Sequence, residues 1–113
     1  MTVKQYSKQM KTGYSNHVVS KLEDFAIVIN VDTDQVAIAK KDIPGGILIE
    51  YRGEKIKIKD LIQKGQRFAL RDMENGEFIR QYGYVFGQSK GILKGELISI
   101  ANIQNILPEV RTG

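Results

Sequence analysis

The chain has 113 residues, of which 42% are hydrophobic and 27% are charged, and its formal net charge at pH 7 is +4. It contains no cysteine and a single histidine, which excludes disulfides, thiolate zinc sites, a cysteine nucleophile and a metal centre built from several imidazoles. This length and composition are typical of one globular domain with a modest hydrophobic core.

The start of the sequence and its apolar runs indicate where in the cell the protein is expected. The polar start, residues 1–7, lacks the apolar middle of a secretory signal. The longest apolar stretch, Phe25 to Ile29, is far too short to span a bilayer. We therefore expect a cytoplasmic protein with no membrane association.

Residues 1–24 are expected to form an N-terminal arm, because they are polar and rich in lysine. Two interpretations of the arm are open. Ser15 is a suitable N-cap for a short helix that carries Val18, Val19 and Leu22 on one side. The segment can equally be flexible.

Half of the net charge lies in this arm, which holds four lysines and two acidic residues. In the remainder, Lys55, Lys57 and Lys59 alternate with Ile56 and Ile58, a pattern typical of a strand with one solvated and one buried face. No aromatic residues are interleaved with these lysines, so nucleic-acid binding is not favoured.

Residues 25–106 are predicted to form a mostly β domain, followed by a C-terminal tail at 107–113. Short apolar runs flank the turn-forming segments Asp32–Asp34 and Arg52-Gly53, which predicts a hairpin at each. Further short runs follow at residues 66–70, 77–81, 84–86 and 96–101.

An internal repeat strengthens the β prediction. An apolar residue followed three positions later by glycine occurs four times, as Ile43…Gly46, Ile62…Gly65, Met73…Gly76 and Ile92…Gly95, and the first two copies recur in the last two with an offset of 30 residues. We expect each glycine to adopt a positive φ before a strand begins. The equal offsets predict a compact domain with pseudo-two-fold symmetry.

Few residues in the sequence form a pattern that indicates catalysis. The Asp32–Asp34 segment lacks the later ligands of a calcium loop and is interpreted as a turn. His17 has no serine or paired carboxylate beside it, so a surface position is expected. The turn residues Asp42, Asp60 and Asp72 are expected to bond local backbone N–H groups.

Arg67 is the exception among the polar residues, because it lies between Gly65 and the apolar run Phe68-Ala-Leu. A guanidinium in this position could bind a carboxylate through two hydrogen bonds. The alternative is an ordinary solvated position on an alternating strand.

Five segments occur in order along the chain: Asp34-Gln-Val-Ala-Ile-Ala, Asp42-Ile-Pro-Gly-Gly, the run from Lys64 to Ile79, the run from Gln81 to Ser89, and the run from Leu93 to Asn102. Together they resemble the SAF domain of the altronate and galactarate dehydratase family, which is found at the N-terminus of these enzymes or as a separate small subunit. The resemblance covers about residues 26–102 and implies a β-clip fold. It also implies that a larger domain or subunit, usually with a divalent metal, carries most of the sugar-acid dehydration site.

The chain departs from the family pattern at every histidine that can be aligned. Those places hold Val31, Gln66, Leu97, Ser99 and Ala101, none of which can shuttle protons near neutral pH or offer an imidazole to a metal. The family's terminal asparagine is retained as Asn102, and its Gly-His-Lys lysine is replaced by Arg67.

The resemblance leads to a first hypothesis: a small subunit that assists a large dehydratase subunit in eliminating water from a sugar acid and is not catalytic alone. Arg67 would then hold a substrate carboxylate or an acidic partner residue, with Gln66, Ser99 and Asn102 along the same edge. No confident catalytic residue, no metal and no cofactor is assigned to this chain, and a divalent metal belongs to the large subunit.

Two rivals stay open. One is a non-enzymatic SAF binding or assembly module, in which the missing histidines mark lost catalysis and the chain self-associates. The other is a nucleic-acid binder that depends on the basic arm.

Overall fold

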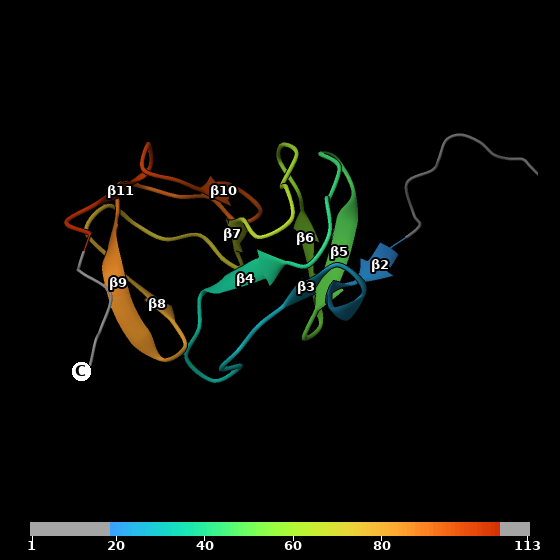
Figure 1. The fold of residues 1–113 in the computed structure, drawn as a ribbon, viewed down its shortest axis with the longest axis horizontal. Coiled ribbons are helices and arrows are strands. Elements are labelled where there is room, and N and C mark those ends of the chain that lie inside the picture. The colour runs from blue at the N-terminus through green and yellow to red at the C-terminus, as the bar shows by residue number, and fades with distance from the viewer. Residues whose placement is uncertain (1–18, 107–113) are drawn as a thin grey trace, which may run out of the picture.

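The structure is a computed structural model that describes residues 19–106 (Figure 1). Its elements are short strands and one 3-10 helix, in the order β2 (Val19–Lys21), η1 (Leu22–Asp24), β3 (Ala26–Ile27), β4 (Val36–Ala39), β5 (Leu48–Tyr51), β6 (Glu54–Lys57), β7 (Arg67–Ala69), β8 (Phe78–Gln81), β9 (Tyr84–Ser89), β10 (Leu97–Ile98) and β11 (Ile103–Gln104). The predicted mostly β fold class is confirmed. No helix within residues 19–106 is long and apolar enough to cross a membrane.

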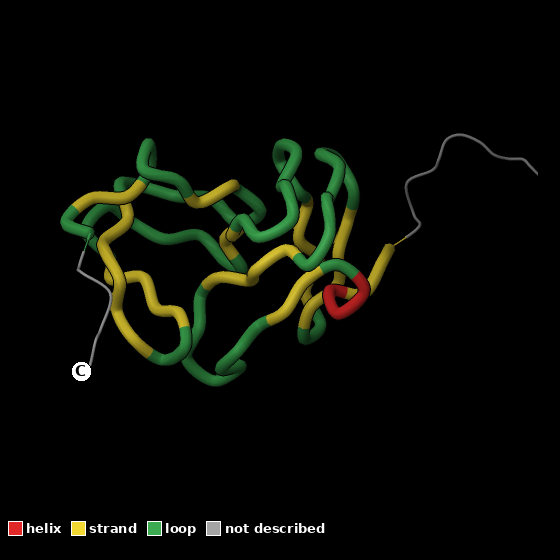
Figure 2. The backbone as a smooth tube through the Cα atoms, in the orientation of Figure 1, coloured by secondary structure: helices red, strands yellow, loops and turns green. Residues whose placement is uncertain are grey.

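The strands of this described part form three small sheets, with a central sheet of order β10-β7-β4-β3. Two further sheets, β2-β5-β6 and β11-β9-β8, each contain one hairpin. Figure 1 shows the central strands between the two hairpins, and Figure 2 shows how much of the path between them is loop and turn. The chain thus places one hairpin layer on each side of a short central sheet.

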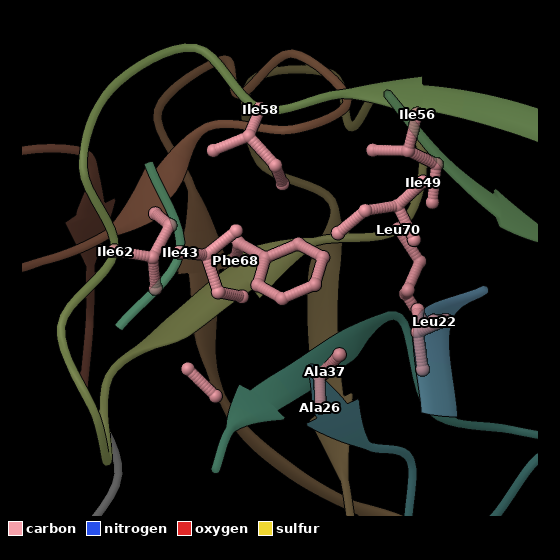
Figure 3. Close-up of a cluster of buried hydrophobic side chains, with 11 residues drawn as sticks. Leu22, Ala26, Ala37, Ile43, Ile49, Ile56, Ile58, Ile62, Phe68 and Leu70 are labelled. Atoms are coloured by element: carbon pink, nitrogen blue, oxygen red, sulfur yellow. The ribbon is translucent and has the colours of Figure 1, made fainter. Parts of the chain in front are cut away.

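The alternation of side chains along the central strands explains this arrangement. Phe68 on β7 and Ala37 on β4 belong to a hydrophobic cluster shared with the β5-β6 hairpin, shown in Figure 3. The next residue on β7, Ala69, and Val36 on β4 belong to a second cluster shared with the β8-β9 hairpin. Since successive strand residues point to opposite faces, the central sheet separates two cores.

The predicted repeat is present in the backbone. Ile43 pairs with Ile62 and Met73 pairs with Ile92 in isolated antiparallel bridges, which reproduces the offset of 30 residues. All four glycines of the repeat have φ between 88° and 93°, as expected for turns that suit glycine. The repeated turns therefore act in pairs, one pair beside each core.

The turn aspartates are structural, but their bonds are not local. Asp42 Oδ1 accepts a hydrogen bond from the Lys64 N–H at 2.9 Å, and Asp72 Oδ1 accepts one from the Lys94 N–H at 2.8 Å. The same contact therefore joins two turns that lie 22 residues apart in each half of the repeat. The expectation of local backbone bonds is wrong for these two residues, because each turn is closed by its bridged neighbour.

The hairpin predictions are confirmed, and one hairpin turn was missed. Arg52-Gly53 joins β5 to β6 with φ values of 52° and 84°, and Tyr82-Gly83 joins β8 to β9 with φ values of 58° and 80°. Positive φ at both central residues is the geometry that matches strand twist in two-residue hairpins. The strands around Asp32–Asp34 also pair antiparallel.

Residues 19–24 pack with the β domain. Val19–Lys21 is a strand parallel to β5, so the helix considered for this stretch does not include Val19. Leu22 follows in the 3-10 helix and is buried in the first core because its aliphatic side chain faces β5 and β3 rather than solvent. The remainder of the arm, including His17, and the tail at 107–113 lie outside the described residues.

Candidate functional site

Arg67 opens β7 in the middle of the central sheet. It is paired with Ile98 of β10 on one side and with Ile38 of β4 on the other. Because side chains alternate along a strand, Arg67 shares a face with Ala69 and so points toward the second core. There its guanidinium carbon lies 5.2 Å from the ring centroid of Phe86 on β9.

The stacking on Phe86 holds the guanidinium without using its hydrogen-bond donors. Within residues 19–106, the side chain of Arg67 has no hydrogen bond or ion pair, and it is half-buried. A cation over an aromatic face gains electrostatic attraction, and the planar fork stays open toward a ligand. The sequence offered no signal that Phe86 would be its partner.

Arg71, four residues further along, provides a contrast. Its Nη2 donates to Glu77 Oε2 in an ion pair, and its Nη1 donates to the carbonyl of Asp72 at 2.9 Å. The hydrogen bond from Arg71 holds the pKa of Glu77 below its usual range, against a smaller opposing effect of burial. The guanidinium of Arg71 therefore bonds to neighbouring residues of the fold. Among the described residues, the guanidinium donors of Arg67 have no such partner.

The other predicted site residues lie at the same end of the β7–β10 pair as Arg67. Gln66 directly precedes Arg67, and Ser99 directly follows Ile98, which is the residue paired with Arg67. Since the two strands are antiparallel, these positions are neighbours at one end of the sheet. Asn102 joins them because it closes the turn that begins at Ser99.

The hydrogen bonds at this end show that the side-chain oxygens of these residues already accept bonds from their own turns. Gln66 Oε1 accepts from the Gln63 N–H at 2.8 Å, and Ser99 Oγ accepts from the Ala101 N–H at 3.2 Å. Asn102 Oδ1 accepts from the Ser99 N–H at 2.9 Å while its Nδ2 donates to the Leu97 carbonyl at 2.7 Å. These three side chains brace turns, which leaves Arg67 as the group best placed to contact a ligand.

The dehydratase family that the sequence resembles has histidine at five aligned positions. Four of these positions lie at the end of the β7–β10 pair where Arg67 is found. Gln66, Leu97 and Ser99 lie on or directly beside β7 and β10, and Ala101 lies in the turn after β10. Val31 lies on the loop before β4. No group of three histidine, cysteine, aspartate or glutamate side chains within residues 19–106 is close enough to hold a metal ion. The residues within this described range therefore do not fit a divalent metal.

The sequence did not indicate two buried polar residues that position the β8-β9 hairpin. Asp34 Oδ2 accepts from the Tyr82 N–H at 2.9 Å and Asp34 Oδ1 from the Gly83 N–H at 2.8 Å, while Gln35 Oε1 accepts from the Arg80 N–H at 2.8 Å. Both side chains are about nine-tenths buried. Asp34 also accepts from the nearby Asn30 N–H, but the partners on the β8-β9 hairpin lie more than 40 residues away in sequence, so no local pattern could reveal them.

Comparison with known proteins agrees with this architecture. A family model described as the altronate/galactarate dehydratase SAF domain matches residues 25–106. Altronate dehydratase of Bacillus subtilis (strain 168) is 32% identical over 79 residues, which cover 69% of this chain and 16% of that enzyme. The match thus spans the β domain and only a small part of the relative's length. The chain belongs to the altronate/galactarate dehydratase SAF-domain family.

Proposed function

We propose that this chain is the SAF component of an altronate or galactarate dehydratase-type hydro-lyase and works with a large catalytic subunit in eliminating water from a sugar acid. The observation that carries the proposal is the family match across the whole β domain, combined with an enzyme relative of which the chain covers only 16%. In this proposal the rest of the dehydratase machinery is carried by the large subunit. The proposal places the activity in the cytoplasm.

In this proposal Arg67 contacts the carboxylate of the sugar acid, or an acidic residue of the large subunit that borders the substrate. Its guanidinium is half-buried, held against Phe86 and without a hydrogen-bond partner in the described part of the chain. Bidentate hydrogen bonding to a carboxylate is the recognition for which a guanidinium is best suited. Gln66, Ser99 and Asn102 support the turns around it rather than touching substrate.

The proposal assigns the proton transfers and any divalent metal to the large subunit. The single histidine of the chain is His17, and the described residues offer no cluster of metal ligands. An arginine can bind and orient an anion, but it does not act as a general base near neutral pH because its pKa is too high. The chain therefore contributes binding and positioning.

A non-enzymatic binding or assembly module is the rival function, and one observation favours it. The end of the sheet where Gln66, Leu97, Ser99 and Ala101 gather carries no imidazole, although the resembling family has histidine there. A module that only binds or assembles needs no proton-transferring group at that place.

Affinity purification of the tagged chain from its own cells distinguishes the two functions. The proposal predicts that a dehydratase-type large subunit co-purifies with the chain, and that the complex consumes altronate or galactarate. A chain that purifies only with copies of itself, in an assembly inactive toward both acids, would support the rival.

A further inference from the structure

A cleft of about 560 Å³ lies on the β5 side of the molecule, between β2, η1, β3 and the end of β5. Apolar side chains line part of it, among them Leu22, Ala26 and Val28. Leu22 and Ala26 also belong to the first core, so this part of the cleft is a fixed surface. A cleft of this size with an apolar lining suits a small organic ligand.

The hydroxyl of Tyr51 provides a second observation. Tyr51 lines the cleft and packs against the first core, and its oxygen is buried without a hydrogen-bond partner within residues 19–106. A buried polar atom left unpaired costs free energy, and such atoms in folded proteins call for a partner. A ligand that enters the cleft and displaces the atoms covering this hydroxyl can satisfy it.

The charged rim indicates which kind of ligand this is. Lys21, Lys40 and Arg52 line the cleft together with Glu23 and Glu50, so cations exceed anions. Lys21 is opposite Glu50 in the pairing of β2 with β5, and these two charges offset each other. None of the five takes part in the ion pairs found within residues 19–106, which join Arg71 to Glu77 and Lys94 to Glu54.

Arg52 is held in place at this rim by its backbone and its side chain. Its φ of 52° lies in the left-handed region, where a long side chain is unfavourable and asparagine or glycine is preferred. Its Nη1 donates to the Val31 carbonyl at 2.7 Å, which directs the guanidinium along the cleft wall.

We propose that this cleft binds a small organic anion, with its carboxylate beside Lys40 and Arg52, its apolar body over Leu22 and Ala26, and a hydrogen bond to the Tyr51 hydroxyl. This site is separate from Arg67, which faces the second core. The inference therefore does not rest on the proposed function.

Amide chemical-shift titration of the full chain tests the site, with benzoate as the probe and the uncharged benzamide as its matched control. The proposal predicts saturable benzoate shifts for residues 21–28 and 50–52, and binding of benzamide weaker by about tenfold, the effect of losing one charge-assisted hydrogen bond. Absence of saturable shifts with benzoate, or equal affinity for benzamide, would overturn it.

Two variants locate the binding. Arg52→Asn removes the cation and suits the positive φ, so the hairpin stays folded, while Tyr51→Phe removes only the hydroxyl. Each is expected to weaken benzoate binding about tenfold, whereas Lys90→Met, an exposed cation on the far half of the repeat, leaves it unchanged. Without benzoate, Tyr51→Phe is expected to be at least as stable to urea as the parent chain, because the unpaired hydroxyl is gone. Unchanged binding in both cleft variants, or equal weakening in Lys90→Met, would contradict the assignment.

Discussion

At the scale of single residues, Arg67 is distinguished from Arg71 by what each guanidinium contacts. Arg71 forms an ion pair with Glu77, whereas Arg67 stacks on Phe86 and has no hydrogen-bond partner in the described part of the chain. The sequence singled out Arg67 from its position in an apolar run. It could not show that the oxygen atoms of Gln66, Ser99 and Asn102 are used within their own turns, because such contacts depend on turn geometry.

Substitutions of Arg67 and Arg71 form a matched pair that tests the proposed function. In the proposed complex with a large subunit, Arg67→Met is expected to raise the KM for the sugar acid by about tenfold or more, since the proposed bidentate contact would be lost while the stem still covers Phe86. Arg67→Lys is expected to restore only part of the affinity, because an ammonium lacks the planar fork. Steady-state kinetics against the Arg71→Met variant measure the effect, and an unchanged KM in Arg67→Met would remove this residue from the site.

Gly95 is a second residue where local geometry decides the outcome. Its φ is 89°, and a Cβ placed on it would lie 2.0 Å from the Lys57 carbonyl oxygen. Gly65 has nearly the same φ, 88°, but a Cβ there would meet nothing within 4 Å. The two positions are equivalent in the repeat, so they separate backbone strain from steric overlap.

We expect Gly65→Ala to lower the free energy of unfolding by about 1 kcal/mol, the cost of a left-handed backbone for alanine. Gly95→Ala is expected to cost about 3 kcal/mol or more, because the backbone of Lys57 must also move. Urea unfolding of both variants measures the difference. Equal losses would mean that the two halves of the repeat do not approach each other at Gly95.

At the scale of elements, the molecule is built from two hairpins that the loop before β4 ties to the central sheet. Short β runs, turn residues and the repeated glycines were enough to predict the Arg52-Gly53 turn, the paired halves and every strand except β2 and β11. The Tyr82-Gly83 turn was missed because tyrosine is unusual at a positive φ. Its conformation is stabilised from outside, by two hydrogen bonds to Asp34.

The substitution Asp34→Asn tests the hydrogen bonds between Asp34 and the Tyr82-Gly83 turn. An amide in place of the carboxylate keeps the size of the side chain, but it sets an N–H₂ group against backbone N–H donors. We expect a loss of about 2 kcal/mol in the free energy of unfolding, and Asp32→Asn on the exposed part of the same loop serves as the control. If both variants unfold at the same urea concentration, the carboxylate of Asp34 does not hold the hairpin.

The contact between Arg71 and Glu77 predicts how the stability of this region depends on pH. The pKa of Glu77 is lower in the folded chain than its usual value, so its stabilising effect is present above the usual glutamate range. It is lost as pH falls through the folded pKa. Glu77→Gln is therefore expected to cost about 1 kcal/mol near neutral pH.

The difference in free energy of unfolding between the parent chain and Glu77→Gln should become smaller in acid, where the carboxyl group of the parent chain is also neutral. Urea unfolding at several pH values follows it. A difference that stays constant from neutral pH to strongly acidic pH would show that the ionised carboxylate is not the stabilising form.

At the scale of the whole molecule, a central sheet with a core on each face explains why so short a chain needs two related halves. The repeat predicted the pairing of turns, while the division into two cores depends on which residues of β4 and β7 face each hairpin. The family could be identified from ordered motifs. In the proposed reaction, this chain contributes binding and positioning.

The rate of water elimination by a dehydratase-type large subunit, measured while this chain is added in increasing amounts, tests the central claim most directly. We predict that the rate with altronate or galactarate rises and saturates at a fixed ratio of the two polypeptides. A rate that does not change at any amount of added chain would contradict the account.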